Sequence, residues 1–86
     1  MIAQASNITT EQTIYTCPTG KRGMVEVYMY SSDSPLVELK VNSITVISMP
    51  LSGTLSIKLV LDQGDTIAAS SDTSSPANVI VSGMLL

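Results

Sequence analysis

Hydrophobic and polar residues alternate along most of the chain, which is the pattern expected of half-buried β-strands. In the segment 24–31, Val25, Val27 and Met29 alternate with polar or aromatic residues. The clearest run is 54–61, where leucine or isoleucine occupies every second position from residue 55. Successive side chains of a strand point to opposite faces of a sheet, so each run has one core face. The alternation predicts strands near residues 12–17, 24–31, 36–41, 44–49, 54–61, 65–70 and 78–85.

Turn-forming residues separate these runs at short intervals. Asn42-Ser43 lies between two apolar runs and could form a two-residue hairpin loop, and Gly64 supplies the positive φ that a tight turn needs. The segment 70–77 is rich in Ser, Asp and Pro, which is typical of an exposed loop. About seven short strands with frequent turn residues predict an all-β fold, a small antiparallel β-sandwich of the jelly-roll or Ig-like type.

The chain is short enough to form a single domain. Its 86 residues predict one β-sandwich domain over residues 12–86, preceded by residues 1–11 as an N-terminal arm or a first strand. The first residues lack a basic start and a long apolar run, so we expect no secretory signal. No segment approaches the roughly 20 apolar residues that cross a bilayer, so we expect no membrane partner.

The residue types needed for catalysis and metal binding are scarce. The chain has no histidine and one cysteine, Cys17, so a His-activated thiol nucleophile and a zinc, haem or iron–sulfur site are not expected. Asp62 and Asp65 flank a predicted tight turn, where aspartates usually hydrogen-bond the nearby backbone. The four Lys and Arg residues are too few for a phosphate-binding groove. We therefore expect no enzymatic activity, no cofactor, no metal and no nucleic-acid partner.

The apolar residues outnumber the core positions that one small sandwich can provide. Only 13% of the residues are charged and 44% are hydrophobic, and several runs are apolar on both faces. A strand that is apolar on both faces must be covered twice, either by another strand of this chain or by another subunit. Tyrosine is favoured at protein interfaces because it combines a large apolar ring with one hydroxyl. The residues predicted to contact another subunit or a capsid are Tyr28, Tyr30, Ile47, Met49, Ile80 and Met84.

Three motifs occur in the same order as in a known group of proteins. Residues 14–21 read Ile-Tyr-Thr-Cys-Pro-Thr-Gly-Lys, residues 61–67 read Leu-Asp-Gln-Gly-Asp-Thr-Ile, and residues 79–83 read Val-Ile-Val-Ser-Gly. In this order the chain resembles small β-sandwich structural proteins of tailed bacteriophages, over residues 12–86. The motif residues mark turns and strands, so no binding residue is transferred from the resemblance. Cys17 stands where an aliphatic residue is more usual in these proteins.

The resemblance implies a component of the virion. We expect a capsid decoration (cement) protein, a homotrimer that bridges major capsid proteins on the capsid surface after synthesis in the host cytoplasm. The alternative is a tail, fibre or head-surface adhesin module that binds a host ligand. In that case the exposed loops 31–35 and 70–77 would carry the function, because loops on a rigid sandwich are common binding surfaces.

Overall fold

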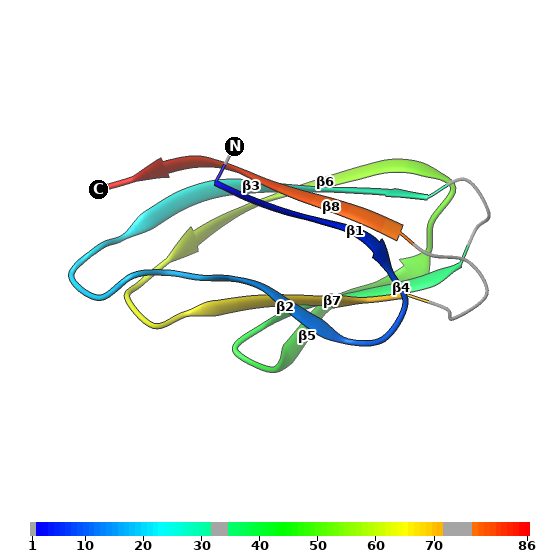
Figure 1. The fold of residues 1–86 in the computed structure, drawn as a ribbon, viewed down its shortest axis with the longest axis horizontal. Coiled ribbons are helices and arrows are strands. Elements are labelled where there is room, and N and C mark those ends of the chain that lie inside the picture. Colours follow the sequence, from blue (N-terminus) through cyan, green and yellow to red (C-terminus); the bar gives the residue numbers. More distant parts are fainter. Residues whose placement is uncertain (1, 32–34, 72–76) are drawn as a thin grey trace.

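The computed structural model describes residues 2–31, 35–71 and 77–86, and all regular secondary structure in these ranges is β-strand (Figure 1). The strands are β1 (Ala3–Ile8), β2 (Gln12–Thr16), β3 (Gly23–Ser31), β4 (Leu36–Val41), β5 (Ile44–Pro50), β6 (Gly53–Leu61), β7 (Thr66–Ser70) and β8 (Ala77–Leu85). All strand pairs are antiparallel. The predicted all-β sandwich is therefore confirmed.

The strands form two sheets of four that pack face to face. The order is β1-β8-β3-β6 in the first sheet, which we call sheet A, and β2-β7-β4-β5 in the second, sheet B. Figure 1 shows sheet A above sheet B. This order, with β1 beside β8 in one sheet and β2 beside β7 in the other, is that of an eight-stranded jelly roll. Between the two predicted sandwich types, the structure has the jelly-roll topology.

The predicted strands agree with the observed ones to within a residue or two at each end. The segment 1–11 had been expected as an arm or a first strand, and residues 3–8 of it form β1, which pairs with β8 at the edge of sheet A. Ile8 of β1 is fully buried in the core. β1 is thus the fourth strand of sheet A.

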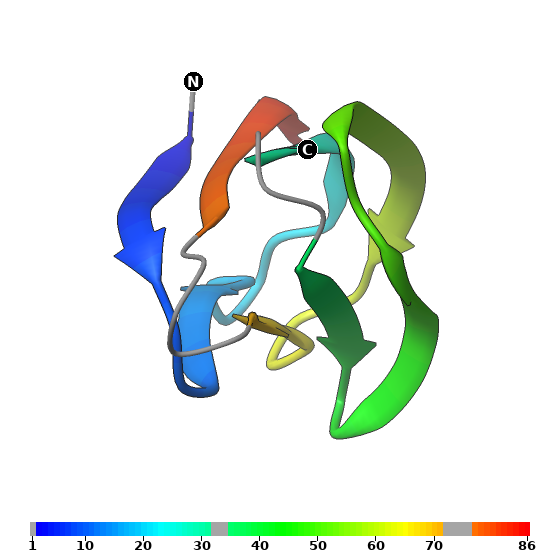
Figure 2. The same cartoon turned by 90° about the vertical axis from the view of Figure 1, so that its right-hand side faces the viewer.

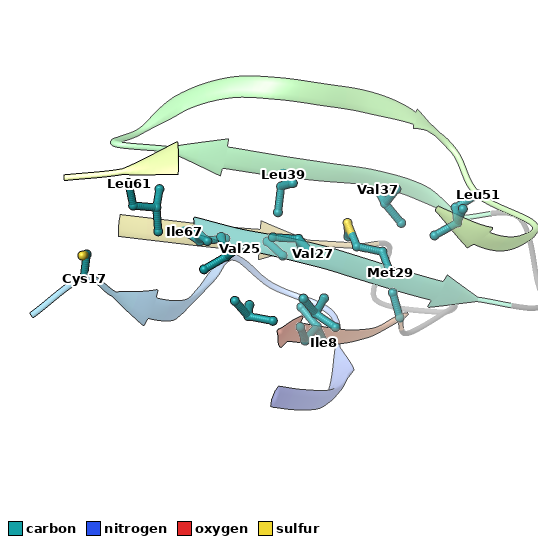
Figure 3. Packing of buried hydrophobic residues seen from close by; sticks show 14 residues of the cluster. Ile8, Cys17, Val25, Val27, Met29, Val37, Leu39, Leu51, Leu61 and Ile67 are labelled. Carbon is teal, nitrogen blue, oxygen red and sulfur yellow. The ribbon is translucent and has the colours of Figure 1, made fainter. Parts of the chain in front are cut away.

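The core lies between the sheets and consists of small and medium aliphatic side chains. In β3 the inward residues Val25, Val27 and Met29 are buried, as the period-two pattern predicted. Figure 3 shows the labelled side chains of the cluster gathered between the two sheets. The radius of gyration is 12.2 Å, close to the roughly 12 Å expected for this length. The buried apolar residues are Ile8, Cys17, Val25, Val27, Met29, Val37, Leu39, Leu51, Leu61, Ile67, Ala69, Ala77, Val79 and Val81.

Two of the sequence motifs meet at one end of the sandwich. Cys17 follows β2 and bonds through its backbone to both residues at the end of the β6–β7 turn: its N–H donates to the carbonyl of Asp65, and its carbonyl accepts from Gly64. The N–H of Gly20 donates to Oε1 of Gln63 over 2.7 Å. The motif residues therefore connect two turns that are more than 40 positions apart in sequence.

The hairpin between β4 and β5 joins the same cluster. Asn42 and Ser43 have φ angles of 53° and 67°, and positive φ at both central residues is the requirement of a type I′ turn. The side-chain amide of Asn42 donates to Oδ1 of Asp65, and its Oδ1 accepts from the N–H of Thr66. The two-residue hairpin predicted from the sequence is confirmed, and its asparagine also bonds to a neighbouring turn.

The glycine of the third motif has a steric role. Gly83 lies in β8 with a φ of 148°, a backbone conformation that residues other than glycine rarely adopt. A Cβ at this position would lie 2.1 Å from the carbonyl oxygen of Met24 in the adjacent strand β3. Glycine at position 83 therefore allows β8 to approach β3 closely in the middle of sheet A.

Candidate functional site

The face of sheet A that points away from sheet B carries six of the twelve exposed large apolar residues in the described ranges. We call it the outer face of sheet A. The strand register arranges its side chains in rows across the sheet. One row joins Met84, Met24 and Val60, and the next apolar row joins Ile80 and Tyr28. The outward positions on the three strands β3, β6 and β8 are Met24, Glu26, Tyr28, Tyr30, Thr54, Ser56, Lys58, Val60, Asn78, Ile80, Ser82 and Met84.

These apolar side chains are accessible to solvent. Tyr28 is 37% exposed, Tyr30 48% and Val60 68%. Ile80, Met24 and Met84 are also exposed. Cross-strand neighbours on one face of an antiparallel pair lie about 5 Å apart, so the residues within each apolar row are in contact range. The polar row of Ser82, Glu26 and Lys58 separates the two apolar rows. Exposed apolar groups bordered by polar residues are typical of an interaction site.

A hollow crosses the outer face of sheet A. It has a volume of about 530 Å³ and spans β6, β3 and β8. Met24, Val60 and Met84 line it together with Glu26, Lys58 and Ser82. An apolar side chain of a partner could enter this hollow.

The two charged side chains at the outward positions of β3, β6 and β8, Glu26 and Lys58, have opposite signs. Glu26 and Lys58 lie opposite each other in the β3–β6 register, next to Ser82. The hydroxyl of Tyr28 donates to Oε1 of Glu26 over 2.7 Å. This hydrogen bond, with smaller contributions from partial burial and the negative charge of Glu26, raises the pKa of Tyr28 above its usual value. The polar atoms here can orient a partner, while the apolar rows supply the area that it would bury.

The structure brings together four of the six predicted contact residues. Tyr28, Tyr30, Ile80 and Met84 all lie on the outer face of sheet A. The sequence left open whether another strand of this chain covers the two tyrosines, and no part of the described chain does so. Their exposure agrees with a surface that is available to another molecule.

Ile47 and Met49 lie elsewhere, on the core side of β5 in sheet B. The sequence had placed them on an outward face opposite Val46. In the β4–β5 register they face Leu39 and Val37, which are buried in the core. The register shifts between residues 39 and 40, so the β5 faces cannot be inferred from simple alternation. Because β5 is the last strand of its sheet, Met49 is still 41% exposed.

Met24 and Val60 also lie on the outer face of sheet A but were not among the predicted contact residues. Both were visible as outward positions, since Met24 is in phase with Tyr28 along β3 and Val60 is in phase with Lys58 along β6. The strand register places them in one row with Met84, and only this row makes them part of a larger apolar group. That register depends on which strands are neighbours, and the alternation within a strand does not reveal it.

Cys17 and Asp65, which were weighed as catalytic residues, form hydrogen bonds with residues of nearby turns. Cys17 is buried, and its Sγ donates to the carbonyl of Lys21 over 3.6 Å. The carboxylate of Asp65 accepts hydrogen bonds from the amide of Asn42 and the N–H of Asp62. These two bonds, that from Asn42 first, lower the pKa of Asp65 below its ordinary value. Asp65 therefore performs the turn chemistry that the sequence indicated.

The remaining polar pairs join neighbouring segments at the surface. Nε of Arg22 lies 3.2 Å from Oδ1 of Asp62, and both side chains are well exposed. Nζ of Lys40 lies 2.6 Å from Oε1 of Glu11, and this hydrogen bond, followed by the charge of Glu11, raises the pKa of Lys40. Among the described residues there is no group of three or more Cys, Asp or Glu placed to hold a metal ion. The same ranges contain no helix with the length and hydropathy to span a membrane.

Comparisons of the chain with models of protein families, with curated proteins and with solved structures found no match. The surface of the molecule and the motifs in its sequence are therefore the features that bear on its function.

Proposed function

We propose that this chain is a bacteriophage capsid decoration protein that binds the major capsid protein through the outer face of sheet A. The observation that carries the proposal is the pair of apolar rows formed by Met84, Met24 and Val60 and by Ile80 and Tyr28, which the described chain leaves exposed. The order of the three motifs supports the assignment to a virion. A jelly roll is also common among viral capsid domains, although the same fold serves other functions.

The size of the surface fits such a role. The chain exposes 4763 Å² in total, and a typical protein interface buries about 800 Å² from each partner, roughly a sixth of that area. The outer face of the four-stranded sheet A can supply an area of this order. The aromatic and methionine side chains on this face are of the types enriched in interface cores, and the Glu26–Lys58 pair between them adds two opposite charges that a partner would have to match.

A decoration protein of this kind acts by adding contacts between capsid subunits. Burial of apolar area on the outer face would supply the binding free energy, at about 25 cal/mol for each Å² removed from water, before the cost of association is subtracted. The rigid jelly roll keeps the two tyrosines and the hollow in a fixed arrangement, so little conformational entropy is lost on binding. No chemical step is involved.

The proposal is tested by co-sedimentation of the purified chain with capsids of the phage that encodes it. We expect the wild-type chain to sediment with the capsids and the variant Tyr28→Ser/Ile80→Ser to bind at least tenfold more weakly. The matched control is Leu36→Ser, which removes an apolar side chain of similar exposure from the outer face of sheet B. Equal binding of all three proteins would contradict the proposed face.

Immunogold labelling of intact virions tests the location separately. Label over the head surface agrees with a decoration protein. Label at the tail tip would reject the capsid proposal and favour the tail or fibre module. Most of the two loops that such a module would use, 31–35 and 70–77, lies outside the described residues.

A further inference from the structure

The four strands at the sheet edges differ in how regularly they pair. β1 has a register shift between Ala5 and Ile8, and β2 has one between Thr13 and Tyr15. β5 pairs with β4 across a shift and ends in Pro50. β6 pairs with β3 over nine consecutive residues without a shift. Bulges and prolines are features by which natural proteins prevent an edge from pairing with another chain, and β6 has neither.

The core side of β6 is incompletely covered. Leu55, Ile57 and Leu59 point toward the interior in register with buried residues of β3, yet they are only partly buried. β5 lies on the same lateral side of the sandwich, as the end-on view in Figure 2 shows. Its core-side residues Ile44 and Met49 are exposed by 67% and 41%. The interior of the molecule is therefore open along this edge.

The sequence of β6 is complementary to itself in antiparallel orientation. A twofold axis at Ile57, the middle residue of β6, would place Leu55 opposite Leu59 of a second copy. Lys58, the one charged residue of the strand, would face Ser56 of the second copy, so no like charges oppose each other. The core-side leucine and isoleucine residues of both copies would then form one continuous row. Apolar pairs and the absence of like-charge pairs both favour such a ladder.

We propose that β6 pairs antiparallel with β6 of a second copy of this chain, giving a twofold dimer in which the two A sheets join into one. Pairing of two nine-residue strands adds on the order of eight to ten backbone hydrogen bonds and covers the open edge. The two outer faces of sheet A then lie on the same side of the joined sheet. This dimer differs from the trimer implied by the phage resemblance, because two identical edges pair around a twofold axis.

Analytical ultracentrifugation of the full chain, from micromolar to millimolar concentration, tests the proposal. We expect a monomer–dimer equilibrium for the wild type. Ser56→Lys puts a lysine opposite Lys58 of the second copy at two symmetric positions, and we expect it to weaken the dimer about tenfold. Ser56 is exposed on the outer face, so the fold of the monomer is not affected. The circular dichroism spectrum checks this.

A charge exchange and a matched control make the result specific. Ser56→Lys/Lys58→Glu pairs each new lysine with a glutamate of the second copy, and we expect it to restore the dimer. Ser48→Lys makes the same substitution on β5, the other free edge on this side, and should leave the dimer unchanged. A monomer or a trimer for the wild type would overturn the proposal. A dimer that withstands Ser56→Lys, or that Ser48→Lys disrupts, would overturn it as well.

Discussion

The two outer faces of the sandwich differ in composition. On sheet A one cross-strand row consists of Met84, Met24 and Val60, and the pair of Ile80 and Tyr28 follows beyond a polar row. On sheet B the corresponding rows contain Ser70, Glu38 and Ser48, followed by Ala68, Lys40 and Thr45. Both sheets have the same size and share one interior, so the core does not explain the difference. The apolar rows of sheet A therefore point to contacts outside the chain, while the two cross-strand rows of sheet B are mainly polar, as in a solvated sheet.

The largest loss of stability is expected at Gly83, because sheet A has a glycine within a strand and sheet B does not. The strands of sheet B contain no glycine, whereas β8 contains Gly83 in close contact with β3. Gly83→Ala would place a Cβ 2.1 Å from the carbonyl oxygen of Met24. We expect a loss of about 3 kcal/mol or more of the free energy of unfolding, measured by urea denaturation.

Gly64→Ala is the matched control for this substitution. Gly64 also has a positive φ, of 82°, but a Cβ there would meet no atom within 4 Å. We expect it to cost about 1 kcal/mol, the backbone strain without the clash. Equal effects of the two substitutions would show that the close approach of β8 to β3 is unimportant.

A second prediction compares the tyrosines of the two sheets. Tyr15 of β2 in sheet B has a buried hydroxyl with no hydrogen-bond partner among the described residues, and burial is the main cause of its raised pKa. An unsatisfied buried hydroxyl is unfavourable, so Tyr15→Phe should stabilise the protein by about 1 kcal/mol. Tyr28→Phe on sheet A, which removes an exposed hydroxyl, should be nearly neutral. Thermal unfolding of both variants measures these changes in stability. A lower melting temperature for Tyr15→Phe than for the wild type would mean that the Tyr15 hydroxyl has a hydrogen-bond partner.

A third prediction concerns the turn cluster that joins the ends of both sheets. The pKa of Asp65 is lowered in the folded state, so its ionised form stabilises the fold above the ordinary value of 3.8. This stabilisation is lost as the pH falls through the lower folded pKa. The urea midpoint of the wild type should therefore decline more steeply below pH 3.8 than that of Asp65→Asn. Parallel pH profiles for the two proteins would exclude a contribution from this carboxylate.

The smallest effect is expected on the outer face of sheet A itself. Met24→Ser and Val60→Ser replace exposed side chains, and each should change the free energy of unfolding by less than about 0.5 kcal/mol. Chemical denaturation of the isolated chain provides the measurement. A loss of several kcal/mol would indicate that these residues stabilise the fold, and the contrast between the two faces would then have an internal cause.

Much of the fold could be predicted from the sequence, because alternation and turn residues are local properties. The strand 54–61 and the Asn42-Ser43 hairpin are examples. The order of strands in the sheets and the shift opposite residues 39 and 40 could not be predicted, since both depend on pairing between distant segments. For the same reason Tyr28 and Ile80 were found separately, and only the structure placed them side by side. Ile47 was assigned to the wrong face for this reason as well.

The buried position of Cys17 gives the molecule an intrinsic reporter of local opening. Its thiol is enclosed where the end of β2 meets the β6–β7 turn, and the chain contains no other cysteine. A thiol reagent can react only when this end of the sandwich separates from its neighbours. The labelling rate of the unmodified protein therefore measures how often that happens, without the introduction of a dye or a mutation.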